Sequence, residues 1–377
     1  MFVDVYAIQN VPPCNINRDD TGSPKTAIYG GKPRARVSSQ AWKHAMRAEF
    51  KELLPEESLG VRTKLAVQLI ADKITELKPE CSEKAQALAQ RVLEAAGLTI
   101  KESTRAGEEQ GSAVTEYLVF IARSEIKSLA KLAISWEEQG LDAAKVNSAM
   151  KKEVEGVFHG AQAVDIALFG RMLADAPHFN TDASAQVAHA ISVDETVTDY
   201  DYFTAMDDCA AEDNAGAAML DTVAFNTSTL YRYATVDVDS LYEQLGDAQA
   251  TAAGVSAFVE AFVRSMPTGK QNTFANRTLP NAVYVAMRNA QPVNAVSAFE
   301  VPVRAKNDDS ISHQAAEKLG EKLSEFDEAY GTTPQKAWTV VVGEPVDSLE
   351  KIGESATLKE MLDGLYGATL ENLTEEE

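Results

Sequence analysis

The residues best placed for chemistry are seven basic side chains between positions 14 and 47. Only Asp19 and Asp20 oppose them, so seven positive minus two negative charges leave +5 in this segment, while the whole chain carries −22 and its remainder therefore −27. Lysine and arginine bind nucleic acids by displacing counterions condensed on phosphates, so the segment predicts a phosphate-binding surface. Acidic neighbours from elsewhere in the fold would neutralise it equally well, and charge alone leaves both interpretations open. The basic residues are Arg18, Lys25, Lys32, Arg34, Arg36, Lys43 and Arg47.

The two acidic residues inside this basic segment have two interpretations. Acidic side chains within a basic loop could have a functional role, which would make Asp19 or Asp20 candidates for catalysis. We favour the structural interpretation, in which each carboxylate pairs with Arg18 or a neighbouring lysine.

Metal and nucleotide chemistry have little support elsewhere in the chain. The histidines are scattered, without His-Glu-x-x-His spacing and without cysteine partners. Gly31-Lys32 resembles the end of a P-loop, but Thr26 stands where the first glycine is required and Pro33 where a hydroxyl would bind magnesium. We therefore expect no metal, no cofactor and no catalytic residue. The five histidines are His44, His159, His178, His189 and His313.

Aromatic residues are interspersed with acidic ones over positions 192–224. Tyr200, Tyr202 and Phe203 could stack on the bases of a single strand, or they could close a small local core, and the sequence leaves both open. A long excursion with few other apolar residues is typical of a protruding loop or hairpin. The acidic residues are Asp194, Glu195, Asp199, Asp201, Asp207, Asp208, Glu212, Asp213 and Asp221.

The elements that position these residues indicate an α+β protein. A strand over 2–9 is expected to stop at Pro12-Pro13, and the basic residues that follow, up to position 37, are expected in a long irregular loop. Ser38 or Ser39 can cap a helix that ends before Pro55 and carries basic residues on its polar face. A mostly helical block is inserted over 59–160, between strands from both ends of the chain. Further strands are expected over 117–122, 225–236, 282–288 and 337–342, and helices over 123–139, 141–154, 238–245, 255–266 and 310–330.

Composition places the chain among globular proteins. Its 377 residues are 45% hydrophobic and 24% charged, enough for a sizeable core. No apolar run approaches the roughly 20 residues that cross a bilayer, and the first residues lack the pattern of a signal peptide, so we expect a cytoplasmic protein. Cys14, Cys81 and Cys209 are too far apart in sequence to indicate a disulfide framework or a structural zinc site.

Several short blocks at fixed intervals resemble the backbone subunit of the type I-E CRISPR Cascade surveillance complex. The similarity is densest near the N-terminus and continues, in the same order, through most of the chain. The N-terminal blocks are Asn17-Arg18-Asp19-Asp20, Ala27-Ile28-Tyr29-Gly30-Gly31-Lys32, Arg34-Ala35-Arg36-Val37-Ser38-Ser39-Gln40 and Lys43 with Ala45-Met46-Arg47. The later blocks are Val164-Asp165-Ile166-Ala167-Leu168, Gly170-Arg171-Met172, Ala188-His189-Ala190-Ile191, Phe203-Thr204-Ala205 with Asp207-Asp208, and Tyr231-Arg232-Tyr233-Ala234.

This resemblance implies a hand-shaped subunit with an RRM-like (ferredoxin-like) palm, an inserted helical fingers domain and a protruding thumb loop. Several copies would follow one another head to tail along a CRISPR guide RNA, beside other Cascade subunits, and present the RNA for pairing with target DNA. No membrane is involved. The implied division is palm over 1–58, 164–191 and 225–377 (the last with the C-terminal helices), fingers over 59–163 and thumb over 192–224.

The same resemblance implies the residues that contact RNA. Six of them would hold its backbone, and three would splay a base at regular intervals. Arg18, Lys25, Ser38, Gln40, Lys43 and Arg47 form the first group, and Met172, Tyr202 and Phe203 the second.

Two features depart from the family. A lysine-rich helix in the fingers can contact target DNA, but here Lys151 and Lys152 have Glu153 and Glu155 close by, so this contact is not expected. The thumb is also unusually acidic, which favours packing against a basic surface of the next subunit over contact with phosphate. We expect a non-catalytic RNA-binding subunit. The alternatives are a metal-dependent RNA-cleaving subunit that uses Asp19 or Asp20, and a self-assembling scaffold without nucleic acid.

Overall fold

The computed structural model describes residues 1–103, 112–141, 145–205, 219–306 and 309–375. Cys209 and the acidic residues Asp207, Asp208, Glu212 and Asp213 lie outside these ranges. The chain forms two compact units. The first contains residues 1–49, 186–238 and 255–377, and the second contains residues 50–185 and 239–254.

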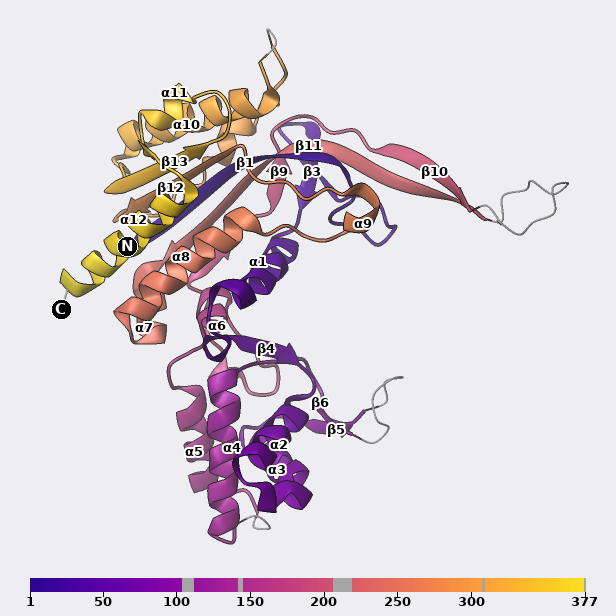
Figure 1. Ribbon diagram of the computed structural model, residues 1–377, viewed down its shortest axis with the longest axis vertical. Coiled ribbons are helices and arrows are strands. Elements are labelled where there is room, and N and C mark those ends of the chain that lie inside the picture. Colours follow the sequence, from indigo (N-terminus) through magenta and orange to yellow (C-terminus); the bar gives the residue numbers. More distant parts are fainter. Residues whose placement is uncertain (104–111, 142–144, 206–218, 307–308, 376–377) are drawn as a thin grey trace, which may run out of the picture. The chain divides into compact units, whose positions relative to one another are not determined.

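A large sheet dominates the first unit (Figure 1). Its long central strands pair antiparallel, with β1 (Phe2–Cys14) between β11 (Met219–Asp237) and β12 (Ala282–Arg288). Among the described residues, the strand order is β14-β13-β12-β1-β11-β9-β3-β2, and both β8 and β10 pair with β11 outside this path. The remaining strands are β2 (Thr26–Tyr29), β3 (Lys32–Val37), β8 (Ala185–Val187), β9 (Ala190–Ser192), β10 (Asp199–Ala205), β13 (Lys336–Val341) and β14 (Glu354–Ser355).

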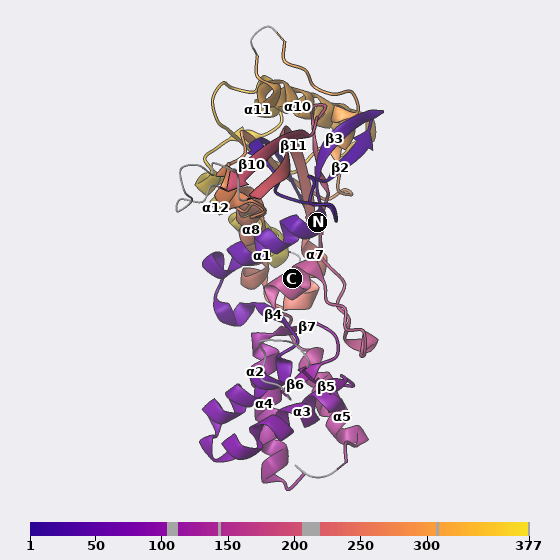
Figure 2. The same ribbon diagram turned by 90° about the vertical axis from the view of Figure 1, so that its right-hand side faces the viewer.

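One face of this sheet is covered by C-terminal elements. Tyr6, Tyr231, Tyr233 and Tyr284 form a buried cluster beneath α10 (Ile311–Tyr330), and their rings are therefore closed to any ligand. Figure 2 shows α10 and α11 (Asp347–Glu350) above the strands. The other helical elements of this unit are η4 (Ala295–Phe299), α9 (Gln271–Phe274) and α12 (Leu358–Glu375), with the greater parts of α1 (Ser39–Leu53) and α8 (Ala248–Arg264).

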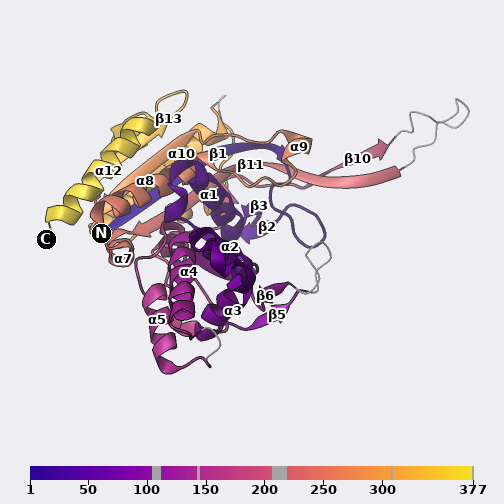
Figure 3. The ribbon, with the colours of Figure 1, turned by 60° about the horizontal axis from the view of Figure 1, so that its bottom comes forward.

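The second unit is mainly helical and has its own core, whose helices α2 to α5 lie together in Figure 3. Inside it, Arg171 Nη1 lies 2.6 Å from a carboxylate oxygen of Glu125, and both side chains are buried. Its helices are α2 (Ala66–Leu77), α3 (Ala85–Ala95), α4 (Arg123–Glu138), α5 (Ser148–Phe158), α6 (Val164–Phe169) and most of α7 (Val238–Leu245), with η1 (Glu56–Ser58), η2 (Pro79–Lys84) and η3 (Pro177–Phe179). Two small ribbons pair β4 (Gly60–Thr63) with β7 (Val119–Ala122) and β5 (Ile100–Glu102) with β6 (Ala113–Thr115).

The mixed α+β organisation predicted from the sequence is confirmed, and three local predictions are wrong. The first strand does not stop at Pro12-Pro13 but continues to Cys14, because a bulge after Val11 accommodates the prolines. Residues 14–37 are not one long loop. Gly30 and Gly31, with φ of 58° and 72°, make the tight turn that joins β2 to β3.

The third error concerns the helix expected over 141–154. It begins only at Ser148, because the side chain of Asn147 accepts hydrogen bonds from the amides of Ala149 and Met150 and so caps the helix there. Among the described residues, no helix combines the length and apolarity required to cross a membrane.

Candidate nucleic-acid interface

The candidate interface is built around the start of α1. Ser38 caps this helix, since its hydroxyl accepts a hydrogen bond from the amide of Ala41 at 3.3 Å. Trp42 and Met46 are buried on one face, whereas Lys43 is half-buried and Gln40, in the first turn, is exposed. Because the first amides of a helix lack intrahelical acceptors and carry its positive dipole end, this helix start favours an anion.

Asn17 ties the preceding loop to this helix start. Its side-chain oxygen accepts a hydrogen bond from the amide of Ser38 at 2.8 Å, and its carbonyl accepts one from the amide of Lys25 at 2.9 Å. Arg18 is exposed and Lys25 half-buried. Neither makes an ion pair with any residue that the structure describes. Both cations can therefore bind an anion near the N-terminus of α1.

Asp19 has a structural role in the same loop. One of its carboxylate oxygens accepts hydrogen bonds from the hydroxyl and amide of Thr21, at 2.7 and 2.9 Å, and from the amide of Ser23 at 3.0 Å. These donors, the Thr21 hydroxyl above all, hold the pKa of Asp19 below its usual range. The expected ion pair with Arg18 is therefore replaced by hydrogen bonds within the loop. Within the described ranges, no three histidine, cysteine or acidic side chains lie close enough to hold a metal ion.

Arg34 and Lys32 are engaged by groups from distant parts of the chain. Arg34 is fully buried, and its guanidinium donates to the carbonyl oxygens of Ser192 and Val193, at 2.8 and 3.0 Å. It also donates to the carbonyls of Phe299 and Glu300, at 2.8 and 3.2 Å. Lys32, at the turn, lies 3.4 Å from Glu195. The sequence therefore overcounted the free charge of this segment.

Arg36 lies next to a histidine that sequence reasoning missed. Its Nη1 is 3.2 Å from Nδ1 of His189, just before β9, while its Nε donates to the carbonyl of Thr26. Burial, together with the positive charges of Arg36 and Lys25, lowers the pKa of His189. The only signal in the sequence was that His189 stands in one of the family blocks; its spacing from other residues gave no indication.

The β10–β11 hairpin carries the expected aromatic residues. Figure 1 shows it extending away from the sheet. Tyr200 and Tyr202 are 69% and 70% exposed and Phe203 is 42% exposed, so they do not close a local core. Because side chains alternate along a strand, Tyr202 and Phe203 point to opposite faces of the ribbon. Asp221, opposite Phe203 on β11, shares its face.

Met172 belongs to the second unit, where it follows α6. Its side chain is 78% exposed. The backbone beside it is fixed, since Arg171 is held by Glu125 and by the carbonyl of Phe179. Met172 is thus an exposed apolar side chain on a rigid support.

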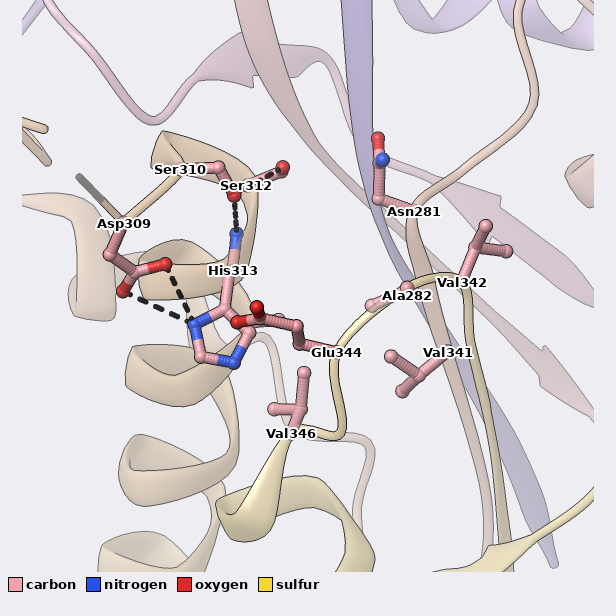
Figure 4. Close-up of a pocket in the computed structure, with 12 residues that line it drawn as sticks. Asn281, Ala282, Asp309, Ser310, Ser312, His313, Val341, Val342, Glu344 and Val346 are labelled. Atoms are coloured by element: carbon pink, nitrogen blue, oxygen red, sulfur yellow. Dashed lines mark hydrogen bonds and ion pairs between the residues drawn. The ribbon is translucent and has the colours of Figure 1, made fainter.

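A separate hollow of about 460 Å³ beside the start of α10 contains serine, histidine and aspartate (Figure 4). Their arrangement is structural. Nδ1 of His313 lies 3.0 Å from Asp309 and Nε2 lies 3.0 Å from the carbonyl of Pro345, so both ring nitrogens are engaged. The Ser310 hydroxyl accepts a hydrogen bond from the amide of His313 and so caps α10. No hydroxyl is therefore activated by the imidazole.

The fold and the site together define a mixed α+β protein with a large sheet and a mainly helical second unit. Basic side chains lie near the start of α1, beside its capped N-terminus. The chain belongs to the family of CT1975-like proteins, which matches residues 3–364. It is similar to a chain of a solved "CRISPR RNA-guided surveillance complex, pre-nicking", with 32% identity, a TM-score of 0.82 and coverage of 98% of this chain and 100% of that one. A chain of a second "CRISPR RNA-guided surveillance complex" matches with 29% identity, a TM-score of 0.72 and the same coverage. The comparison with curated proteins found no match.

Substitutions of Arg34 and Arg18 should have different effects on stability, because Arg34 is buried and Arg18 is exposed. Replacing Arg34 with Ala leaves buried carbonyl groups without donors, so we expect a loss of roughly 3–5 kcal/mol in the free energy of unfolding, measured by urea denaturation. Arg18→Ala, at an exposed site that makes no ion pair with the described residues, should leave the free energy of unfolding unchanged. Equal effects of the two substitutions would contradict these assignments.

His313 should make stability depend on pH. The hydrogen bonds to the Pro345 carbonyl and Asp309 raise its pKa. A raised pKa in the folded state means that the stabilisation is complete below the unfolded value of about 6.5 and is lost as the pH rises through the folded value. The difference in unfolding free energy between wild type and His313→Gln should therefore shrink between pH 6 and pH 9. A difference that grows over this range would show that the imidazolium is not stabilised here.

Proposed function

We propose that this chain is a guide-RNA-binding backbone subunit of a CRISPR surveillance complex of the type I-E Cascade kind. The proposal rests on two cations, Arg18 and Lys25, beside the capped start of α1 in a chain of net charge −22. Neither forms an ion pair within the described ranges of the chain. Likeness to chains of RNA-guided surveillance complexes over 98% of the length supports it.

In this proposal the large sheet is the RRM-like palm, residues 59–163 are the fingers, and the β10–β11 hairpin belongs to the thumb. RNA follows the helix start and the edge of the palm, since the tyrosine-rich face of the sheet is covered. Copies of the chain bind head to tail along the guide RNA in the cytoplasm, with other complex subunits, and the exposed bases pair with target DNA. The subunit needs no cofactor.

The alternation of side chains along β10 distinguishes the aromatic residues that were expected to contact bases. Tyr200 and Tyr202 share a face whose described partners on β11 are Ala224 and Thr222. Phe203 shares its face with Asp221 and with the acidic residues Asp199 and Asp201. Because carboxylates repel phosphate, Tyr202 faces the RNA in this proposal, and Phe203 faces a protein neighbour.

The helix α1 should contribute to RNA retention in a salt-dependent way. Lys43→Ala combined with Arg47→Ala should weaken binding of guide RNA in filter-binding titrations and lower the slope of log K against log salt by about 1.4, since each phosphate contact on a single strand contributes about 0.7. Lys318→Ala with Lys322→Ala, on α10, removes the same charge and serves as the matched control. Unchanged retention by the Lys43/Arg47 variant at every ionic strength would contradict the site.

The subunit should not cleave RNA. We expect the assembled complex to leave labelled complementary RNA intact in the presence of magnesium, because Asp19 is engaged in its own loop. Cuts at guided positions that disappear in Asp20→Ala would instead establish a metal-dependent nuclease.

A further inference from the structure

Two cations and an imidazole meet at the edge of the sheet without an acidic partner. Arg36 comes from β3, Lys25 from the loop between β1 and β2, and His189 from the turn before β9. Over the described part of the chain, neither Arg36 nor Lys25 forms an ion pair with a carboxylate. Like charges repel, so an acidic protein that keeps them together without compensation leaves a place for an anion.

The geometry fixes the protonation state of the imidazole. A guanidinium can only donate hydrogen bonds, so His189 Nδ1, 3.2 Å from Arg36 Nη1, must accept. The ring is therefore neutral and carries its proton on Nε2. Protonation of Nδ1 would place two donors against each other, and it requires Arg36 to move away.

We propose that Lys25, Arg36 and His189 form a phosphate site in which RNA binding is coupled to uptake of one proton by His189. The inference rests on the proposed function and adds a regulatory property to the same surface. A phosphate group draws the guanidinium of Arg36 onto its oxygens and releases Nδ1. The imidazole then takes a proton from solvent, and both ring nitrogens become donors, one of them toward the phosphate.

The surroundings of His189 determine the direction of the coupling. Arg36 from β3 and Lys25 from the loop are the charged groups that act on the ring, and no charged side chain of the flanking strands β9 and β11 contributes. Both charges lower the pKa of His189 in the free protein, as does burial. A bound phosphate offsets them and raises that pKa, so affinity for RNA increases as the pH falls.

The test is a series of filter-binding titrations of guide RNA between pH 5.5 and pH 8 at constant ionic strength. Wild-type affinity should rise toward low pH, by at most about tenfold per pH unit for one proton. His189→Gln keeps a neutral hydrogen-bonding side chain that does not titrate, so its affinity should stay constant from pH 8 to pH 5.5 and the rise should be lost. Arg36→Gln should bind more weakly at pH 8 and show a smaller rise, because the charge that keeps the free imidazole neutral is removed.

Two histidine variants identify the titrating group. His44→Gln, on the exposed side of α1, and His313→Gln, beside α10, should keep the wild-type pH dependence. RNA binding without any rise, or a rise that persists in His189→Gln, overturns the coupling and leaves the proposed function intact. Absence of RNA binding at every pH overturns the proposed function and the coupling with it.

Discussion

The antiparallel pairing of β3 with β9 is the constraint on which the basic surface depends. In this register, Arg36 lies opposite Ile191 and Val37 opposite Ala190. Arg34 then reaches the carbonyls at the end of β9, whereas Arg36, two residues further on and on the same side of the strand, reaches His189. A slip of one residue would turn both guanidiniums to the other face and would remove the anchor and the site together.

The distribution of acidic residues explains how a chain of net charge −22 can present a positive surface. Two carboxylates near the basic segment have partners of their own: Asp19 accepts hydrogen bonds within its loop, and Glu195 pairs with Lys32 at the turn. Charges farther away than the Debye length of about 8–10 Å are largely screened at physiological salt. The field at the start of α1 is therefore set by the charges of the adjoining loop, which include Arg18, Lys25 and Asp19, and by the helix dipole more than by the net charge.

The sequence predicted those features that depend on neighbours in the chain. The cap at Ser38, the helix that follows it and the strands over 282–288 and 337–342 all have local signals, and the structure confirms them. The burial of Arg34 could not be predicted from the sequence. Its acceptors at Ser192 and Phe299 are more than 150 residues away, and only the tertiary fold removes its guanidinium from water. The contact between Arg36 and His189 was hidden for the same reason.

Strand alternation gives the β10–β11 hairpin two chemically different faces. Two exposed tyrosines, Tyr200 and Tyr202, keep apolar ring area in water on one face. Within the described residues of the hairpin, Asp199, Asp201 and Asp221 fall on the other face, beside Phe203, so a polyanion that approaches this part of the ribbon is repelled from that side. In the proposed function, this alternation of side chains orients the hairpin on RNA by charge, without a base-specific contact. This agrees with the proposal that base pairing reads the guide sequence, since such a subunit must hold every guide in the same way.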